Sequence, residues 1–259
     1  MFNQERQTAI LEWLEKHERV EVTELSGHFG VSVDTIRRDL RQMEEEGHLK
    51  RTHGGAILPK RPGMSAGYTT RKKLHIREKS EIARTAASFI EDDDTLLIDG
   101  STTTAAMVPY FGQFKGLTVF TNSITIAAEI IGAFKHIKVF VIGGLLHSEH
   151  ASTISTESEL FIRRLHVDKV FVGSCSISAE RGLSATEIED AAVKEAMLKA
   201  GRQVIVLADS SKFARESLIQ IAPLDPAYVV ITDEGFSEAM QARFAPLAAQ
   251  GLKIVVAGH

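Results

Sequence analysis

The chain of 259 residues is longer than one typical domain, so we expect two. An apolar fraction of 44% with only six prolines excludes a disordered protein. The net charge is −4, and residues 1–58 hold eight Lys and Arg against eleven Asp and Glu, so any polyanion-binding surface must segregate its positive charge on one face. A single cysteine, no apolar run that could span a bilayer and no signal-peptide pattern predict a cytoplasmic protein without an internal disulfide.

Three helices are predicted at the start of the chain. Apolar residues recur at helical spacing in residues 5–16, 22–29 and 33–43. The hydroxyl of Ser32 is suited to capping the third helix, and Gly47 to ending it, because glycine adopts a left-handed turn without steric cost. Two helices, a glycine turn and a third helix make the plan of a helix-turn-helix domain.

The third predicted helix carries arginines on the face opposite its apolar stripe. Guanidinium groups pair with phosphates and with guanine edges in the DNA major groove. Residues 48–57 are predicted to form two short strands around a turn, which makes a basic wing. A solvated helix with ordinary surface charge is the alternative, but the helix-turn-helix plan favours double-stranded DNA as the partner. The predicted DNA-binding residues are Ser32, Thr35, Arg37, Arg38, Arg41, Lys50, Arg51 and His53.

Residues 31–56, VSVDTIRRDLRQMEEEGHLKRTHGGA, resemble the N-terminal signature of the DeoR family of bacterial transcriptional regulators. The match covers the segment from Ser32 to Leu40 and the closing residues from Arg51 to Ala56. The resemblance implies a winged helix-turn-helix domain that reads an operator.

A connector follows the predicted wing. Residues 59–63 combine two prolines, a glycine and two basic residues, a composition typical of exposed linkers. Residues 68–90 are predicted to be helical; in the resembling family this helix joins the two domains, and His75 stands where asparagine is more usual. The predicted domains are 1–58 (winged helix-turn-helix), 59–91 (linker and joining helix) and 92–259 (α/β domain).

From residue 95 onward, short apolar, β-branched runs alternate with helix-like segments. Continuous apolar runs belong to strands buried on both faces, and their alternation with helices predicts a doubly wound, mostly parallel sheet. The predicted strands are TLLID, LTVFT, KVFVI, KVFVG, QVIVLAD, YVVIT and KIVVA, and the predicted helices are 104–111, 123–131, 156–165, 189–200 and 237–249.

The ends of these predicted strands are polar or rich in glycine. Open α/β sheets bind ligands at the carboxyl ends of their strands, and amides at a helix start together with hydroxyls form a phosphate site. Each end alone is typical of an ordinary cap or turn, but several converging ends with Lys212 favour a pocket for a small phosphorylated, polyhydroxylated anion. The candidates are Asp99, Gly100, Ser101, Thr102, Thr103, Thr121, Asn122, Ser123, Gly143, Gly144, Gly173, Asp209 and Lys212.

This half resembles the C-terminal sensor domain of the DeoR family and, more distantly, ribose-5-phosphate isomerase. The matching pieces are DGSTTT, TNS, IGG, GLSATEIEDAAVKEAM and LADSSKF. The resemblance implies that residues 99–103 and 121–123 hold the phosphate and neighbouring hydroxyls. It also implies that Lys194 and Lys212 are cationic contacts and that Asp209 orients a hydroxyl.

Two classes of function compete. One is a transcription factor whose second domain senses a phosphorylated sugar. The family resemblance implies that it represses a carbohydrate-catabolism operon and that the ligand releases it from its operator. The other is a sugar-phosphate isomerase with an accessory helical domain, which needs a base and groups that stabilise an enediolate. The strand end at residues 173–176 has no carboxylate and no loop like KGGGG occurs, so we expect binding without turnover, with Glu187 and Glu189 as the remaining candidate bases.

The sequence also bears on cofactor binding and on the oligomeric state. No G-x-G-x-x-G follows the first strand, which argues against a Rossmann dehydrogenase, and the ten scattered histidines argue against a metal site, so we expect no cofactor. One winged module buries too little DNA surface for tight, selective binding, so we expect a homo-oligomer, a dimer or tetramer, on repeated half-sites.

Overall fold

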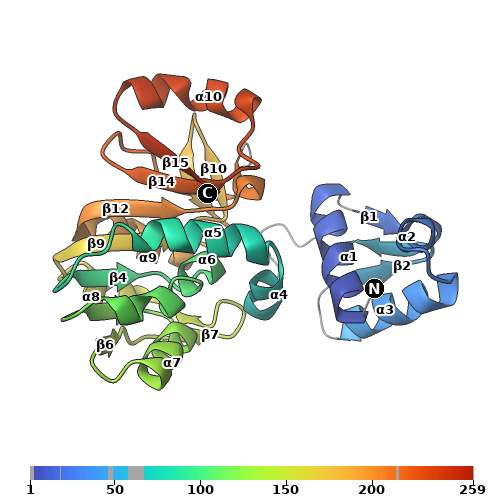
Figure 1. Cartoon of the computed structure of the whole chain (residues 1–259), viewed down its shortest axis with the longest axis horizontal. Coiled ribbons are helices and arrows are strands. Elements are labelled where there is room, and N and C mark those ends of the chain that lie inside the picture. Colours follow the sequence, from blue (N-terminus) through green and yellow to red (C-terminus); the bar gives the residue numbers. More distant parts are fainter. Residues whose placement is uncertain (1–2, 18, 46–48, 58–66, 214–215, 259) are drawn as a thin grey trace. The chain divides into compact units, whose positions relative to one another are not determined.

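The computed structural model describes residues 3–17, 19–45, 49–57, 67–213 and 216–258, and the chain divides into two compact units, Met1–His75 and Ile76–His259 (Figure 1). The predicted helix end at Gly47 and the predicted connector at residues 59–63 lie outside the described residues. In the described part of the chain, no helix combines the length and apolar character that crossing a membrane requires.

The first unit is built on the three helices that the sequence predicts: α1 (Asn3–His17), α2 (Val22–Phe29) and α3 (Val33–Glu45). Ile36, Leu40 and Met43 of α3 are at most 1% exposed, because their spacing places them on one helix face. They pack with Ile10 and Leu14 of α1 in one hydrophobic core.

A small antiparallel sheet completes this unit, with strand order β1-β3-β2. Its strands are β1 (Arg19–Glu21), β2 (Lys50–Thr52) and β3 (Gly55–Ile57). β2 and β3 form the predicted wing hairpin. β1 was not predicted, because only Val20 of its three residues is buried and so small a strand has no recognisable alternation.

The predicted continuous helix at residues 68–90 was wrong, because two helices occupy this segment: α4 (Tyr68–Lys73) and α5 (Ile76–Ala87). Leu74 leaves α4 in an extended conformation and is only 2% exposed in the core of the first unit. His75 then has a φ of 51°. Histidine is among the non-glycine residues enriched in this left-handed region, so His75 is suited to the bend between the two helices.

The second unit contains a seven-stranded parallel sheet with strand order β15-β14-β12-β9-β4-β5-β6, and all seven predicted strands are confirmed. Their bounds are β4 (Thr95–Ile98), β5 (Thr118–Thr121), β6 (Lys138–Val141), β9 (Val167–Gly173), β12 (Gly201–Leu207), β14 (Val229–Asp233) and β15 (Lys253–Ala257).

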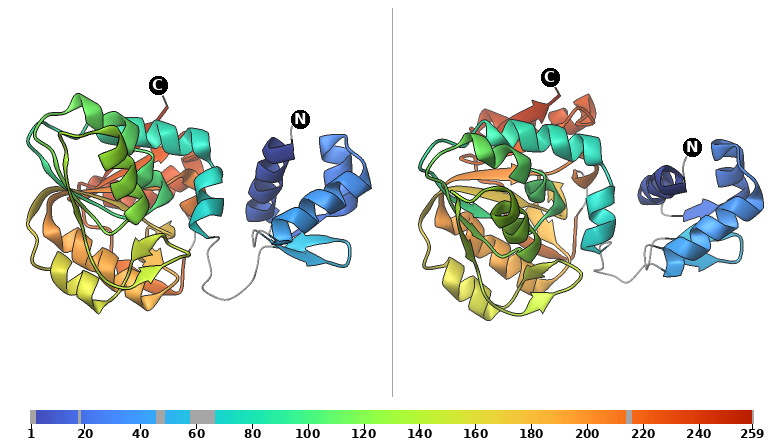
Figure 2. Two further views of the ribbon diagram at one scale, coloured as in Figure 1. Left: turned by 90° about the horizontal axis from the view of Figure 1, so that it is seen from below. Right: turned by 60° about the horizontal axis from the view of Figure 1, so that its bottom comes forward.

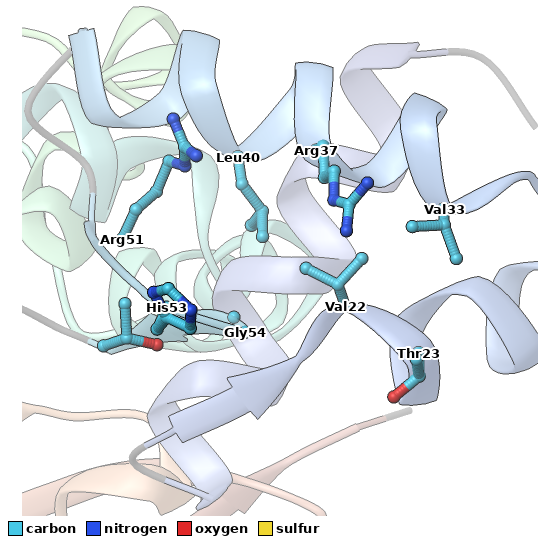
Figure 3. A pocket seen from close by; sticks show the side chains of 10 residues that line it. Val22, Thr23, Val33, Arg37, Leu40, Arg51, His53 and Gly54 are labelled. Atoms are coloured by element: carbon cyan, nitrogen blue, oxygen red, sulfur yellow. The ribbon is translucent and has the colours of Figure 1, made fainter.

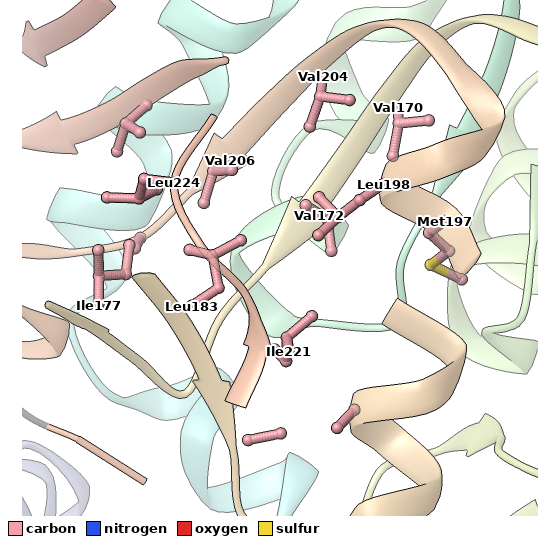
Figure 4. Close-up of a cluster of buried hydrophobic side chains, with 14 of the residues drawn as sticks. Val170, Val172, Ile177, Leu183, Met197, Leu198, Val204, Val206, Ile221 and Leu224 are labelled. Atoms are coloured by element: carbon pink, nitrogen blue, oxygen red, sulfur yellow. The ribbon is translucent and has the colours of Figure 1, made fainter. Parts of the chain in front are cut away.

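Helices cover both faces of this sheet (Figure 2). Val170 and Val172 of β9 face Met197 of α9 (Figure 4), whereas Phe171 between them belongs to the cluster on the opposite face. The continuous apolar runs therefore reflect burial on both sides. The cluster facing Phe171 includes residues of α5, α6 (Thr102–Ala105) and α7 (Ile124–Ala133), and the cluster with Val170 includes residues of α8 (Thr156–Ile162), α9 (Ile188–Ala200) and α10 (Glu238–Ala249).

The predicted helix at residues 104–111 was wrong in its bounds. The short α6 begins at Thr102, and a separate 3-10 helix spans Val108–Gln113 with a proline in its first turn. The hydroxyl of Thr104 donates to the backbone oxygens of Asp99 and Ser101, a local bond that competes with helix continuation.

Short strands form two further pairings that were not predicted. A three-stranded antiparallel sheet consists of β10 (Ser176–Ser178), β11 (Gly182–Ala185) and β13 (Ile219–Ala222). A hairpin consists of β7 (Leu146–His147) and β8 (Ser152–Thr153).

The order of the parallel strands defines where a ligand would bind. From β4 the chain proceeds outward through β5 to β6 at one edge, then returns to β9 on the other side of β4 and proceeds to β15 at the opposite edge. The direction of winding therefore reverses between β4 and β9. A crevice outside the carboxyl ends of the strands at such a point is the usual ligand site of open α/β sheets.

Candidate functional site

The turn between α2 and α3 is fixed by local hydrogen bonds. Gly30 ends α2 with a φ of 62°, and the hydroxyl of Ser26 donates to the backbone oxygen of Val31 at 2.7 Å. The hydroxyl of Ser32 accepts from the backbone N–H of Thr35 at 3.2 Å, so Ser32 caps α3 as predicted. These contacts set the direction in which α3 leaves the turn.

Three exposed arginines lie on the face of α3 opposite its buried stripe. The guanidinium of Arg37 is 3.4 Å from the carboxylate of Asp34, one turn earlier. Arg38 and Arg41 make no ion pair within the described residues, so their guanidinium groups are available to another molecule. Of the other predicted contacts, Ser32, Lys50 and His53 are exposed, and Thr35 and Arg51 are partly exposed.

A small cleft of about 150 Å³ lies between α3 and the wing. Arg37, Arg51 and His53 line it (Figure 3), so the structure brings together three of the predicted DNA-binding residues. Glu44 near the end of α3 accepts a 2.8 Å hydrogen bond from the backbone N–H of Arg51 and so ties the wing to the helix. No sequence pattern indicated this role, since Glu44 stands within an acidic run.

A buried ion pair holds α1 against α3. The guanidinium of Arg6 donates to the carboxylate of Asp39 at 2.6 and 3.1 Å, and both side chains are less than 10% exposed. The hydrogen bond to Asp39 raises the pKa of Arg6 above its ordinary value. Asp39 lies next to the apolar stripe of α3, a position that could have signalled a buried partner.

In the second unit, Asp99 stands at the reversal point between β4 and β9. Its carboxylate accepts from the backbone N–H of Gly173 at 2.7 Å and lies 2.8 Å from the ammonium of Lys194 on α9. Asp190, one turn earlier on α9, lies 3.8 Å from the same ammonium. The structure thus joins three of the predicted candidates, Asp99, Gly173 and Lys194, in one buried cluster with Asp190.

The charges in this cluster largely compensate one another. Burial acts to lower the pKa of Lys194, but Asp190 and Asp99 outweigh it, so the pKa lies above its ordinary value and the ammonium stays charged. Burial raises the pKa of Asp190. Since two carboxylates already surround Lys194, its contact with a ligand anion stays a prediction.

Lys212 has different surroundings. It ends a 3-10 helix, Ser210–Lys212, which begins three residues after the last residue of β12. Its side chain is partly exposed and makes no ion pair among the described residues. Asp209 accepts from the backbone N–H of Ser211 at 3.2 Å and is only 1% exposed, so it shapes the turn that carries Lys212. Lys212 is therefore better placed than Lys194 to offer positive charge to a ligand.

Close packing fixes the glycines at the strand ends. A Cβ atom at Gly100 would lie 1.7 Å from the hydroxyl of Ser152, and one at Gly173 would lie 2.5 Å from the side chain of Ser101. The hydroxyl of Ser101 accepts from the backbone N–H of Thr104 at 3.1 Å. The predicted loops after β4 and β9 therefore touch each other.

The unpredicted hairpin β7–β8 lies against the ends of β4 and β5. Asn122 accepts from the backbone N–H of Gly100 at 3.1 Å and donates to the backbone oxygen of Thr153 at 3.0 Å. Ser123, the cap of α7, forms a β-bridge with Ser152. The predicted residues Gly100, Asn122 and Ser123 are thus linked through a segment that the sequence did not indicate.

The remaining predicted ligand-binding positions lie in the strand ends and loops near the hairpin β7–β8. The backbone oxygen of Gly143 accepts from the hydroxyl of Ser158 at 2.8 Å, and Gly144 has a φ of 140°. A cavity of about 320 Å³ lies between the hairpin and Glu187, whose carboxylate is 3.3 Å from the imidazole of His150. Thr102, Thr103 and Thr121 are all less than 10% exposed.

Comparisons with known proteins agree over both halves. The family model of the DeoR-like helix-turn-helix domain matches residues 6–61, and that of the DeoR C terminal sensor domain matches residues 74–234. The chain is 37% identical to the HTH-type transcriptional repressor GlcR of Bacillus subtilis over 90% of this chain and 89% of that relative. It is 35% identical to the transcriptional repressor AccR of Agrobacterium fabrum, over 90% of each chain. It is 31% identical to the L-fucose operon activator of Haemophilus influenzae, over 91% of this chain and 94% of the relative.

Solved structures give a weaker likeness. A D-ribose-5-phosphate isomerase in complex with phospho-erythronic acid aligns with a TM-score of 0.39 and 16% identity, over 58% of this chain. The alignment spans 56% of the isomerase chain.

Proposed function

The chain belongs to the DeoR family of DNA-binding transcriptional regulators, and from this premise we propose that it represses a carbohydrate-catabolism operon and leaves its operator when a phosphorylated sugar binds. Two of the relatives described above are named as repressors, which supports this sign of regulation. The L-fucose operon activator is named for the opposite sign, but its name also connects a relative with a sugar operon.

We expect α3 to enter the major groove with its N-terminal half. The supporting observation is that the apolar and basic residues of α3 lie on different faces of the helix. The apolar stripe is buried, whereas Arg38 and Arg41 are exposed without an ion pair among the described residues. Such guanidinium groups can pair with guanine edges or phosphates. Arg37, Arg51 and His53 around the cleft then contact the backbone of the same duplex, together with Ser32, Thr35 and Lys50.

The observation that carries the effector proposal is the contact between the loops after β4 and β9 at the point where the sheet reverses its winding. The hydroxyls of Ser101, Thr102 and Thr103 surround the phosphate, and Lys212 supplies positive charge. Thr121, Asn122, Ser123 and the glycines at the strand ends shape the remainder.

Binding without turnover follows from the same region. An isomerase needs a base that can take a proton from a carbon of the substrate. The carboxylate of Asp99 already accepts from Gly173 and pairs with Lys194, and Glu187 lies beside His150. The site therefore binds its ligand for sensing.

The test is a titration of operator binding with candidate sugar phosphates, for the wild type, Lys212→Ala and the control Lys115→Ala, whose side chain is exposed before β5. A coupling of about 1–3 kcal/mol corresponds to a roughly 5–150-fold loss of operator affinity on ligand binding. The wild type and the control should respond, whereas Lys212→Ala should bind operator equally well but not respond. An unchanged response in Lys212→Ala would contradict the pocket, and isomerisation of the ligand would favour the enzyme alternative.

The same proposal includes association of the chain with itself. A winged module that reads one half-site makes a small interface, and a pair on two half-sites gains both affinity and selectivity. We therefore expect the regulator to act as a dimer or a larger even assembly.

A further inference from the structure

Exposed apolar side chains of the second unit gather in residues 124–146. Of the twelve large apolar side chains that are strongly exposed among the described residues, six lie in this segment, between 44% and 65% exposed. They are Ile124, Ile131, Phe140, Val141, Leu145 and Leu146. The segment also has only three charged side chains in 23 residues, and such depletion of charge is typical of the core of a protein interface.

β6 is an edge strand that is exposed on both faces. It pairs with β5 on one side, and the sheet ends at its other side. Phe140 stacks on Phe120 of β5 with ring centroids 4.7 Å apart, whereas Val141 points to the opposite face; these two side chains are 48% and 51% exposed. A hydrophobic edge strand of this kind is a template for pairing with another strand.

α7 lies beside β6 at this end of the sheet (Figure 1). Ile126 and Ile130 face the core, but Ile124, Ala128 and Ile131 are exposed at positions i, i+4 and i+7, which places them in one stripe on the outer side of the helix. Ala128 lies near the middle of the stripe, four residues after Ile124 and three before Ile131. Two antiparallel copies would therefore place Ile124 near the partner's Ile131, with the small alanines near the crossing point.

We propose that β6 and the outer stripe of α7, here called the β6–α7 edge, join two copies of this chain about a two-fold axis perpendicular to the sheet. Antiparallel pairing of the two β6 strands continues the sheet across the axis and keeps corresponding faces on the same side. The two α7 helices then meet on one face and the two Phe140 rings on the other. A second copy is the occupant because an open strand edge can pair with the same edge of another copy, and because the apolar stripe of α7 has a small residue near its middle and isoleucines at both ends. This placement rests on the proposed action of the chain as a pair.

Sedimentation of the full chain at micromolar concentration tests this contact. The wild type should sediment at twice the 28.4 kDa chain mass or at a larger even multiple. Val141→Lys and Ile131→Lys place charge in the buried contact and should raise its dissociation constant at least about tenfold, so the sedimenting mass should shift toward half of the wild-type value as the protein is diluted. Leu218→Lys is the matched control, because Leu218 is 72% exposed outside this segment, and it should sediment as the wild type does.

A cysteine cross-link supplies a second readout that does not depend on the lysine variants folding. Ala128→Cys should form a disulfide-linked dimer on mild oxidation, because a bridge needs Cα atoms within about 7 Å. The wild type, with Cys175 as its only cysteine, is the control and should not cross-link. A monomeric wild type would contradict pairing itself. A wild-type oligomer that neither lysine variant weakens and that Ala128→Cys does not cross-link would overturn the β6–α7 edge alone.

Discussion

Removing the ammonium of Lys194 should strongly destabilise the second unit. Its side chain is 7% exposed, and it lies between the carboxylates of Asp99 and Asp190, which are 5% and 8% exposed. Lys194→Met keeps the length and helix propensity of the side chain but leaves two buried carboxylates without a counter-charge. Breaking a buried ion pair on one side costs about 3–5 kcal/mol. For a unit of this size each kcal/mol lowers Tm by roughly 2–4 °C, so we expect a decrease of roughly 6–20 °C.

Lys199→Met provides the matched control on the same helix. Lys199 pairs with Glu195 one turn earlier, but these side chains are 60% and 39% exposed, and an exposed helical pair contributes only about 0.3–0.5 kcal/mol. Unfolding of the full chain by urea or heat, followed by circular dichroism at pH 7, measures both variants. Asp99→Asn combined with Lys194→Met should cost less than the sum of the single changes. If Lys194→Met were no more destabilising than Lys199→Met, the buried cluster would not depend on charge compensation.

Three further predictions concern other contacts. Arg38→Ala should weaken operator binding by about 1–3 kcal/mol, whereas Arg84→Ala on α5 should not, and equal titration curves would exclude α3 from the groove. Gly173→Ala should destabilise the protein by about 1–3 kcal/mol in urea unfolding, because its Cβ would lie 2.5 Å from Ser101, and adding Ser101→Gly should recover part of the loss. Burial raises the pKa of Asp190 above its ordinary value of 3.8, so the folded state binds this proton more tightly than the unfolded chain. The stability of the wild type relative to Asp190→Asn should therefore fall as pH rises from 3.8 through the folded-state pKa, and a flat difference would contradict this reasoning.

Elements with a clear apolar pattern, periodic in the helices and continuous in the strands, were predictable from the sequence. The predicted helix at residues 22–29 matches α2, and the seven apolar runs match the seven parallel strands. In both cases the pattern arises from burial of the element's own side chains. The break at Leu74 and His75 was missed, because the burial of Leu74 and the left-handed backbone at His75 depend on packing that helix periodicity does not contain.

The candidate site was predictable only in part. The polar strand ends follow directly from the sequence, but the partners of Asp99 do not, because Gly173 and Lys194 reach it only through the folded sheet. The hairpin β7–β8 was missed for the same reason: each of its strands has two residues, and pairing across the chain defines them. The resemblance to known sensor domains implied that Lys194 belongs to the site. Its ion pairs with Asp99 and Asp190 could be seen only in the structure.

The division of α3 into a buried and an exposed face has a consequence for how such regulators diverge. Ile36, Leu40 and Met43 anchor the helix in the core, whereas Arg38 and Arg41 lie on the surface. Exchanging a surface residue of a helix away from caps and ion pairs usually changes stability by less than about 0.5 kcal/mol. After a gene duplication, one copy can therefore acquire a new target sequence through substitutions on the exposed face while its scaffold stays intact, and many regulators with different targets can arise from one architecture.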